Sequence, residues 1–532
     1  MSAKRSMSRA LTREESYQDG HLTRTAFISI AILTFITFVG NFTQLQLSAA
    51  LPTIVSDFGI SVTTGQWLTS IFQLVMGVMV PLTAFLTRRF STRQIVICSM
   101  AVFTLTRRFS TREIGLVSMV VFTIGSLFAW LGPTFLMVLI GRLLEAVGTG
   151  VMWPVLQITV FSIYPLSRRG FAMGTVGMAM SVAPAIGPTL GGVQTDLNGW
   201  RSIFLTLTII GVISLLLAYF GLHNFGENDK TAKADFFSVG LSIFGFGGLM
   251  FGFTNIESYS FVNPMVWLPM VIGVVGIIWF VLRQIHGARR QIENPEAQPP
   301  LLNLSVLKNR SFTVGTITAA LSFFAFSSIM VIMPLYIQDC RGYSAAISGL
   351  VMLPGALGQC ISQFFGGKVL DRFGARPVAL IGTITLCFGT VMMSLISMTS
   401  WIWWVSIWQF VRQIGMGFVL MPITTWSLNC LEPEEVSAGS AVTNTVRQIA
   451  GAIGAPVLVI LMETFTSLRW TALGGAKAVY AAANVFGIQW ALRISAAICF
   501  VMVLMVFFGV RGQGAGSTHE TVQRALNRRR AA

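Results

Sequence analysis

The chain has 532 residues, of which 54% are hydrophobic and only 11% are charged, and its mean hydropathy is +0.73. Soluble globular domains carry about 25% charged residues, so this composition excludes them and indicates a polytopic membrane protein. The six cysteines are scattered without the spacing of metal ligands, and we expect neither a metal site nor a disulfide framework.

Residues 1–25 form a mixed-charge tail without the short apolar core and cleavage site of a removable signal peptide. A membrane-spanning helix needs about 20 predominantly apolar residues. Fourteen such segments follow, centred near residues 37, 74, 122, 147, 182, 211, 245, 274, 324, 357, 388, 414, 450 and 499. An even number of spans places both tails on one side of the membrane.

The net charge of +16 could suggest nucleic-acid binding, but the placement of the charges argues against it. Most of the 36 Lys and Arg fall in the tails and in loops on the same side, among them Arg168, Arg169 and the run Arg528–Arg530. Cytoplasmic loops are enriched in Lys and Arg, so both termini are predicted to be cytoplasmic. We expect contact with a lipid bilayer and a small molecule, and none with nucleic acid.

The spans group into an all-α integral membrane fold with two six-helix bundles and two intervening helices. We predict a cytoplasmic tail (1–25), a first bundle (26–222), two extra transmembrane helices (236–284), a cytoplasmic linker (285–310), a second bundle (311–510) and a second tail (511–532). The linker is recognised by QIENPEAQPP, whose prolines and polar residues do not suit a span.

A tandem repeat lies between the second and third spans. Residues 86–104 and 105–123 share fourteen identities over nineteen positions. The apolar part of the first copy is too short to cross the bilayer. We place it on the inner side, as an amphipathic or re-entrant extension of the third helix, and assign it no chemistry.

Each half of the chain also repeats an arginine that lies within a span and is followed by glycines. The sets are Arg142 with Gly148 and Gly150, Arg412 with Gly415 and Gly417, and Arg447 with Gly451 and Gly454. Internal repetition of this kind is typical of secondary transporters.

The fifth span contains the sequence VAPAIGPTLGG, from Val182 to Gly192. Small residues recur every four positions and form one stripe on which a second helix backbone can pack closely, at Ala179, Ala183, Gly187 and Gly191. Pro184 and Pro188 each remove a backbone donor and are expected to loosen the helix. The alternative is an ordinary small-residue packing face.

At this point the chain resembles the major facilitator superfamily, specifically its fourteen-span drug and proton antiporter branch. The fifth span is similar to the antiporter motif of the drug exporters, at Pro184, Gly187, Pro188, Gly191 and Gly192. GKVLDRFGAR resembles the superfamily's inner-loop signature, with Gly367, Asp371, Arg372, Gly374 and Arg376. The resemblance implies the major facilitator fold, pairing of Asp371 and Arg372 with a neighbouring helix end to hold the inner gate, and a tight turn at Gly374.

Two departures from the family pattern affect the expected mechanism. In the first inner loop the positions of the signature glycines and aspartate are occupied by Ala84, Arg88 and Ser91, so this copy of the gate is degenerate. In the first span Thr43 stands where the branch has an acidic residue. A proton-carrying carboxylate is therefore not expected at that place.

Glu145 is the single acidic residue that we place deep in the membrane. A charged carboxylate at bilayer depth costs on the order of 3 kcal/mol, and binding a proton avoids this cost. Glu145 is thus the candidate proton carrier, with Arg142 three residues earlier on the same helix face. The alternative is a static pair in which the two side chains simply neutralise one another.

Six polar or amphipathic side chains at plausible depth are candidates for a substrate cavity: Gln44, Gln46, Gln73, Trp153, Gln409 and Trp426. Aromatic walls with sparse polar partners accept many amphipathic molecules. Packing or interfacial anchoring is the more common role of each such residue. The spans hold Arg142, Arg412 and Arg447 against one Glu, which favours neutral, zwitterionic or anionic cargo over dications.

The leading hypothesis is a proton-coupled exporter of amphipathic drugs or toxic metabolites that works by alternating access, as a monomer in a bacterial plasma membrane. It needs no cofactor, because a proton gradient supplies the energy. An uncoupled facilitator or importer remains an alternative, as does a membrane sensor without turnover, which would call for a longer soluble segment. The sequence offers no pairing of nucleophile and base, so an enzyme is not expected.

Overall fold

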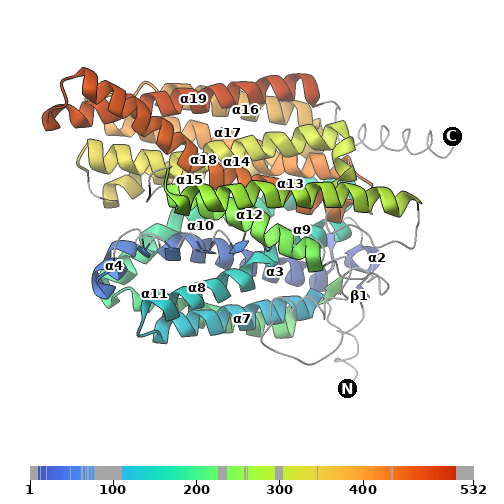
Figure 1. Cartoon of the computed structure of the whole chain (residues 1–532). Coiled ribbons are helices and arrows are strands. Elements are labelled where there is room, and N and C mark those ends of the chain that lie inside the picture. Colours follow the sequence, from blue (N-terminus) through green and yellow to red (C-terminus); the bar gives the residue numbers. More distant parts are fainter. Residues whose placement is uncertain are drawn as a thin grey trace. The chain divides into compact units, whose positions relative to one another are not determined.

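A computed structural model describes residues 10–510, except residues 12, 19–20, 48–49, 61–63, 66, 69–70, 73–74, 77–78, 80–110, 226–235, 257–258, 260–261, 294–302, 344 and 433–434. Helices dominate the described chain (Figure 1). This agrees with the physics of the bilayer, where a helix satisfies all its backbone hydrogen bonds internally. Several positions from the sequence analysis lie outside the described residues: Gln73, Ala84, Arg88, Ser91 and the first copy of the tandem repeat.

The chain forms two compact units. The first comprises Met1–Pro165, Ile186–Val306 and Pro433–Thr445, and the second comprises Leu166–Ala185, Leu307–Glu432 and Val446–Ala532. Two long helices, α10 (Arg169–Asn198) and α18 (Val436–Ala472), therefore contribute to both units.

The other helices of the first unit are α2 (Arg13–Ser16), α3 (Arg24–Gln46), α4 (Leu51–Phe58), α7 (Thr111–Leu131), α8 (Phe135–Gly150), α9 (Met152–Ile163), α11 (Arg201–Gly221), α12 (Phe236–Ile256) and α13 (Pro264–Glu293). Strand β1 (Ala10–Leu11) pairs in parallel with β4 (Asn224–Phe225), and β2 (Tyr17–Gln18) pairs with β3 (His21–Leu22) in antiparallel fashion. Helix α7 lies beside α8 and α11 (Figure 1).

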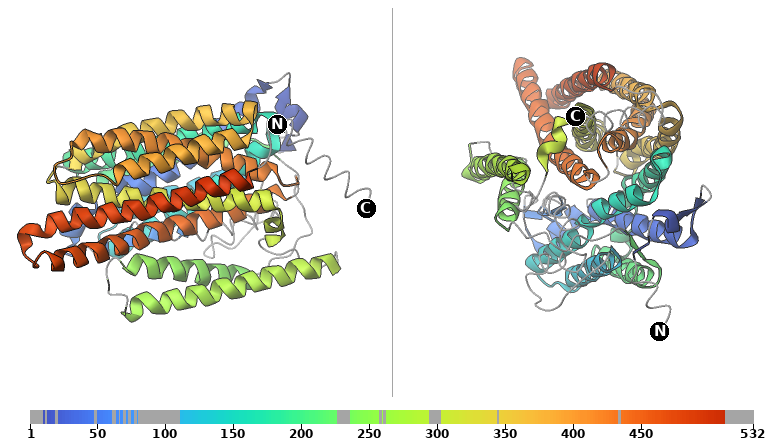
Figure 2. Two further views of the ribbon diagram at one scale, coloured as in Figure 1. Left: turned by 90° about the horizontal axis from the view of Figure 1, so that it is seen from above. Right: turned by 90° about the vertical axis from the view of Figure 1, so that its right-hand side faces the viewer.

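Glycines allow the closest helix contacts in this unit. A Cβ atom at Gly141 would lie 2.6 Å from the carbonyl oxygen of Gly125, and one at Gly148 would lie 2.5 Å from that of Ser118. Helices α7 and α8 are thus pressed together along the face of α8 that carries Gly141 and Gly148, next to Glu145. Helices α12 and α13 form a second close pair through Gly245 and Gly276 (Figure 2).

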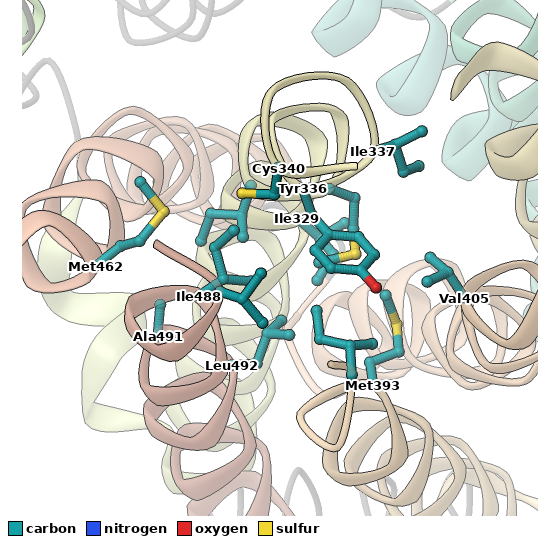
Figure 3. Close-up of a cluster of buried hydrophobic side chains, with 14 of the residues drawn as sticks. Ile329, Tyr336, Ile337, Cys340, Met393, Val405, Met462, Ile488, Ala491 and Leu492 are labelled. Carbon is teal, nitrogen blue, oxygen red and sulfur yellow. The ribbon is translucent and has the colours of Figure 1, made fainter. Parts of the chain in front are cut away.

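The second unit holds α14 (Arg310–Leu335), α15 (Ala345–Phe373), α16 (Ala375–Met393), α17 (Ile402–Asn429) and α19 (Tyr480–Gly509). One of its hydrophobic clusters gathers around Tyr336, whose ring is surrounded by Ile329, Met393, Val405, Ile488 and Leu492 (Figure 3). The phenol hydroxyl leaves this apolar surrounding and donates a hydrogen bond of 2.7 Å to the carbonyl of Ser397. The cluster joins α14, α16, α17 and α19 into one body.

Every predicted span except the second coincides with described helix, and the second falls where only short helical pieces are described. Among the described residues, nine helical segments are long and apolar enough to cross a membrane, and two more apolar helices are shorter. Helix α17 is not one of the nine, because Gln409, Arg412 and Gln413 lower its hydropathy. All three side chains are buried within the protein, which explains how so polar a helix can form a span.

Two details of the helices differ from a simple span. The fourth predicted span is divided at Val151 into α8 and α9. In contrast, α10 continues as one helix through Pro184 and Pro188, where loosening was expected. Each proline removes one backbone hydrogen bond, and the helix nevertheless continues past both positions.

Candidate functional site

Arg142 and Glu145 form a buried ion pair within α8. The Nη1 atom of Arg142 donates to Oε2 of Glu145 over 2.8 Å, and both side chains are completely buried. Their spacing of three residues on a helix brings the two groups onto one face. The two side chains thus lie next to one another, as expected. This geometry fits both a proton-exchanging pair and a static one.

Neutral groups surround this pair. Ser126 on α7 donates a hydrogen bond of 2.7 Å to the other carboxylate oxygen of Glu145. Arg142 donates to the carbonyl oxygens of Leu68 and Thr43 over 3.2 and 3.3 Å, and its guanidinium lies 4.5 Å from the centre of the Phe72 ring. Its Nη2 atom is buried without a hydrogen-bond partner among the described residues. Protonation of Glu145 would therefore leave the charge of Arg142 without its anion.

Thr43, which replaces the expected acid of the first span, contacts Arg142 through its backbone. Its hydroxyl donates to the carbonyl of Val39, one helical turn earlier, over 2.7 Å. The side chain of Thr43 is thus engaged by α3 itself, and its backbone is linked through Arg142 to the carboxylate of Glu145.

The glycines of the fifth span pack against the end of α3. A Cβ atom at Gly187 would lie 3.3 Å from the Cβ atom of Leu45, and one at Gly191 would overlap the carbonyl oxygen of Gln46. Gly192 is half-buried beside them. The motif thus forms a close packing face, as its small-residue stripe predicts, and its contribution to export stays a prediction.

The inner-loop signature joins α15 to the start of α10 within the second unit. The carboxylate of Asp371 accepts hydrogen bonds from the backbone N–H groups of Gly170 and Phe171 over 2.9 and 2.7 Å. The first N–H groups of a helix have no partner within the helix, and their positive end attracts an anion. Gly367 brings the two helices together, because a Cβ atom there would overlap the carbonyl oxygen of Gly170.

The remaining signature residues have different surroundings. Arg372 is exposed, and its guanidinium lies 5.3 Å from the ring centre of the adjacent Phe373. Arg376 donates to the carbonyl of Phe507 over 3.3 Å. Gly374 has φ = +85° in the turn between α15 and α16, a conformation that favours glycine. Within the described contacts, Asp371 rather than Arg372 provides the bond to a neighbouring helix end.

We expect Asp371→Ala to lower the free energy of unfolding by about 1–2 kcal/mol, because it removes the acceptor of two N–H groups at a helix start. Chemical denaturation followed by circular dichroism in detergent measures this change. Arg372→Ala is the matched control and should behave as the natural chain does. Equal stability of the two variants would show that the carboxylate contributes nothing to the junction.

The predicted cavity residues are divided between the units. In the first unit, Gln46 is buried and donates to Gln194 on α10, Gln44 is half-buried, and the indole of Trp153 donates to Asn444 over 2.9 Å. In the second unit, Gln409 and Trp426 are buried, and the Oε1 atom of Gln409 has no hydrogen-bond partner among the described residues. Their grouping in one cavity stays a prediction.

The other two buried arginines lie in the second unit. Arg412 donates to Thr390, Gln413 and the carbonyl of Ala325, over 3.1, 3.3 and 2.8 Å. All three acceptors are neutral, in contrast to the carboxylate beside Arg142. Arg447 stacks on Phe323, with its guanidinium 5.2 Å from the ring centre.

Several buried polar residues escaped the sequence analysis. Gln157 on α9 accepts hydrogen bonds from Ser440 and Asn444 on α18 over 2.6 and 2.8 Å, which extends the contact of Trp153. Gln359 and Gln363 on α15 are buried one turn apart, like Gln409 and Gln413 on α17. The available signal was the spacing of four residues between amides in otherwise apolar spans. Within the described residues, no cluster of His, Cys, Asp and Glu could hold a metal ion.

Comparisons with known proteins agree with this architecture. The model of the Major Facilitator Superfamily matches residues 30–106, 104–238 and 236–455, with its first break at the junction of the tandem repeat. The MFS-type transporter YcnB of Bacillus subtilis is 33% identical over 87% of this chain and 93% of its own. The lincomycin resistance protein LmrB of Listeria innocua is 31% identical, over 82% and 86% of the two chains. The multidrug export protein EmrB of Escherichia coli is 24% identical, over 82% and 79%.

A solved structure supports the fold. The human organic anion transporter MFSD10 (TETRAN) superposes with a TM-score of 0.59 at 12% identity, covering 90% of this chain and 99% of its own. The predicted fold class is confirmed, as is the resemblance derived from the motifs. Because the family model matches most of its length, the chain belongs to the Major Facilitator Superfamily.

Proposed function

We propose that this protein is a secondary transporter that exports amphipathic small molecules in exchange for protons by alternating access. The names of its relatives LmrB and EmrB, which refer to lincomycin resistance and multidrug export, support export of this kind. The single structural observation that carries the proposal is the carboxylate of Glu145, completely buried beside Arg142. An intramembrane carboxylate is a functional candidate because burial links its charge to its protonation.

The surroundings of the pair suggest how exchange would proceed. With Glu145 ionised, the pair carries no net charge in its low-dielectric site. When a proton binds, Arg142 keeps its charge without a neighbouring anion, so this state favours rearrangement of the helices around α8. Release of the proton on the other side would restore the pair and return the protein to its first state.

The buried polar groups also support a type of cargo. Amide side chains are buried on several helices, at Gln46, Gln157, Gln359, Gln363, Gln409 and Gln413. Neutral amides recognise hydroxyl, amide and carbonyl groups and offer no full negative charge to a dication. We therefore propose that neutral, zwitterionic or anionic amphiphiles are better cargo than dications.

The proposal extends to location and partners. The protein would work as a monomer in a bacterial cell membrane, with both termini in the cytoplasm, and it would use a proton gradient without any cofactor. It would bind the small-molecule cargo and the lipid bilayer, bind no nucleic acid and catalyse no covalent reaction. The large apolar side chains exposed along α13, such as Trp267, Val271, Val275, Ile278 and Leu282, fit contact with lipid.

Cargo-driven proton movement tests the proposal. Proteoliposomes that contain the purified chain and a trapped pH dye receive, in turn, neutral, anionic and dicationic amphiphiles. We expect cargo gradients to move protons in the opposite direction, with the larger signals from neutral or anionic compounds. Liposomes without protein and protein treated with a protonophore are the controls. Cargo flux that is independent of the pH gradient would contradict proton exchange.

The uncoupled facilitator remains a second candidate, because the same ion pair supports it. Arg142 and Glu145 already neutralise one another over 2.8 Å, so the pair could persist through the whole cycle. In that case cargo would move down its own gradient in either direction. The proteoliposome experiment separates the two candidates directly.

A further inference from the structure

The start of α18 is held on α9 by an uncharged hydrogen-bond network. Asn444 accepts from the indole of Trp153 over 2.9 Å, and its amide donates to Gln157 over 2.8 Å and to Ser440 over 3.4 Å. Gln157 accepts a further bond of 2.6 Å from Ser440. We name these four residues the α9–α18 lock. Three of them are at most 1% exposed, and Trp153 is 9% exposed.

The lock contacts the first part of α18, and the compact units divide α18 after this part. Residues Pro433–Thr445 belong to the compact unit of α9, whereas α18 continues from Val446 in the other unit. Helix α10 shows the reciprocal arrangement, because its part up to Ala185 belongs to the unit of α15 and the rest to the unit of α3. Asp371 holds that first part of α10 at its amino end.

The two contacts correspond through the internal repeat. Each of the two predicted bundles has six spans, so α10, in the fifth span of the first bundle, corresponds to α18, in the fifth span of the second. The inner loop that carries Asp371 likewise corresponds to the loop with Ala84, Arg88 and Ser91, which lacks the carboxylate. The start of α18 therefore needs another means of attachment than a carboxylate from that loop.

In the proposed topology, both contacts lie toward one side of the membrane. Helix α9 ends at Ile163 and α10 begins at Arg169, while α17 ends at Asn429 and α18 begins at Val436. Because each connection is short, the two helix ends that it joins lie on the same side of the membrane. In the proposed orientation this is the cytoplasmic face, where cargo must enter an exporter.

One hydrogen-bond donor of the lock also has no partner among the described residues. The Nε2 atom of Gln157 is buried without a hydrogen-bond partner among the described residues. A buried donor without a partner reduces the net gain from a contact, because water would satisfy it in the open state. Breaking the network exposes no full charge either, so its opening requires only that neutral groups exchange partners.

We propose that Trp153, Gln157, Ser440 and Asn444 form an uncharged inner lock that closes the cytoplasmic side together with Asp371, and that it replaces the carboxylate missing from the first inner loop. The lock rests on the alternating-access function proposed above. Entry of cargo from the cytoplasm requires that both the α9–α18 lock and the contact of Asp371 open.

Hydrogen–deuterium exchange of the full chain in lipid nanodiscs tests this lock. Asn444→Ala removes three hydrogen bonds of the network, and Trp153→Phe removes one but keeps the aromatic ring. We expect exchange that is about threefold to tenfold faster in residues 436–445. The decisive readout is residues 169–185 of α10, which the lock does not touch and which should also exchange faster. Asp371→Asn should in turn accelerate exchange in residues 436–445.

Gln489→Ala is the matched control, since its amide donates a single bond of 2.6 Å to the carbonyl of Ile396, away from the lock. It should leave both segments unchanged. Faster exchange confined to the segments next to each substitution would overturn the proposal, because a local tie loosens only its own surroundings. If Asn444→Ala fails to fold, Trp153→Phe decides alone. The measurement needs neither cargo nor a gradient, so failure of proton exchange would not affect it.

Discussion

Glu145→Gln is expected to abolish proton movement driven by cargo while cargo-for-cargo exchange persists. The amide of Gln has nearly the shape of the carboxylate, and its oxygen can still accept a hydrogen bond from Arg142 while its NH2 group donates to the hydroxyl of Ser126, but it takes up no proton at physiological pH. The proteoliposome dye experiment measures the first effect, and uptake of labelled cargo into cargo-loaded liposomes measures the second.

The substitution also affects stability, and the two effects need separation. Arg142 would remain buried without its counter-ion, and breaking one partner of a buried pair destabilises a protein by about 3–5 kcal/mol. Thermal unfolding in detergent should therefore show a lower midpoint. Retained cargo-for-cargo exchange would demonstrate that the folded fraction is competent.

Glu463→Gln is the matched control, because Glu463 is an exposed carboxylate on α18 that undergoes the same chemical change. It should exchange protons as the natural chain does. If Glu145→Gln also exchanged protons normally, the pair with Arg142 would be static and another group would carry the proton.

Gly191→Ala is expected to lower the stability of the protein strongly, and at this position even one methyl group is too large. Its Cβ atom would overlap the backbone carbonyl oxygen of Gln46. A backbone atom cannot rotate away as a side chain can, so α10 would have to move away from α3. Overpacking of this kind costs typically about 1–3 kcal/mol, and a backbone neighbour places this site at the upper end.

Gly349→Ala in α15 is expected to have the opposite effect on stability. A Cβ atom there meets nothing within 4 Å, and Ala is favoured over Gly in a helix by roughly 0.5–1 kcal/mol. The yield of monodisperse protein and the thermal midpoint should fall for Gly191→Ala and stay level or rise for Gly349→Ala. A Gly191→Ala protein as stable as the natural chain would refute close packing between α10 and α3.

The sequence predicted the surroundings of single helices better than the contacts between them. The ion pair of Arg142 and Glu145 could be anticipated, since a spacing of three residues is local to one helix. The tight approach at Gly187 and Gly191 could also be anticipated, because a stripe without side chains invites a neighbour. The identity of that neighbour, the end of α3, could not be read from the stripe.

The polar residues show most clearly that contacts between helices cannot be predicted from the sequence alone. Gln46, Trp153 and Gln409 share an amphipathic character in sequence, which favoured a common cavity. In the structure Gln46 bonds to Gln194 and Trp153 bonds to Asn444, while the common cavity stays a prediction. A helix can direct a polar side chain to a ligand, to lipid or to another helix, and the choice depends on which helix lies alongside.

The sequence by itself determined that this is an all-α membrane protein, because hydropathy acts along one chain segment at a time, and the resemblance of its local motifs indicated the Major Facilitator Superfamily. Only the tertiary structure decided that Asp371 meets the start of α10 and that Gln157, Ser440 and Asn444 meet across α9 and α18. The residues of each contact are more than 190 positions apart in the sequence. The reason is physical: a hydrogen bond requires two groups within about 3 Å, and at such separations only the packing of the helices sets that distance.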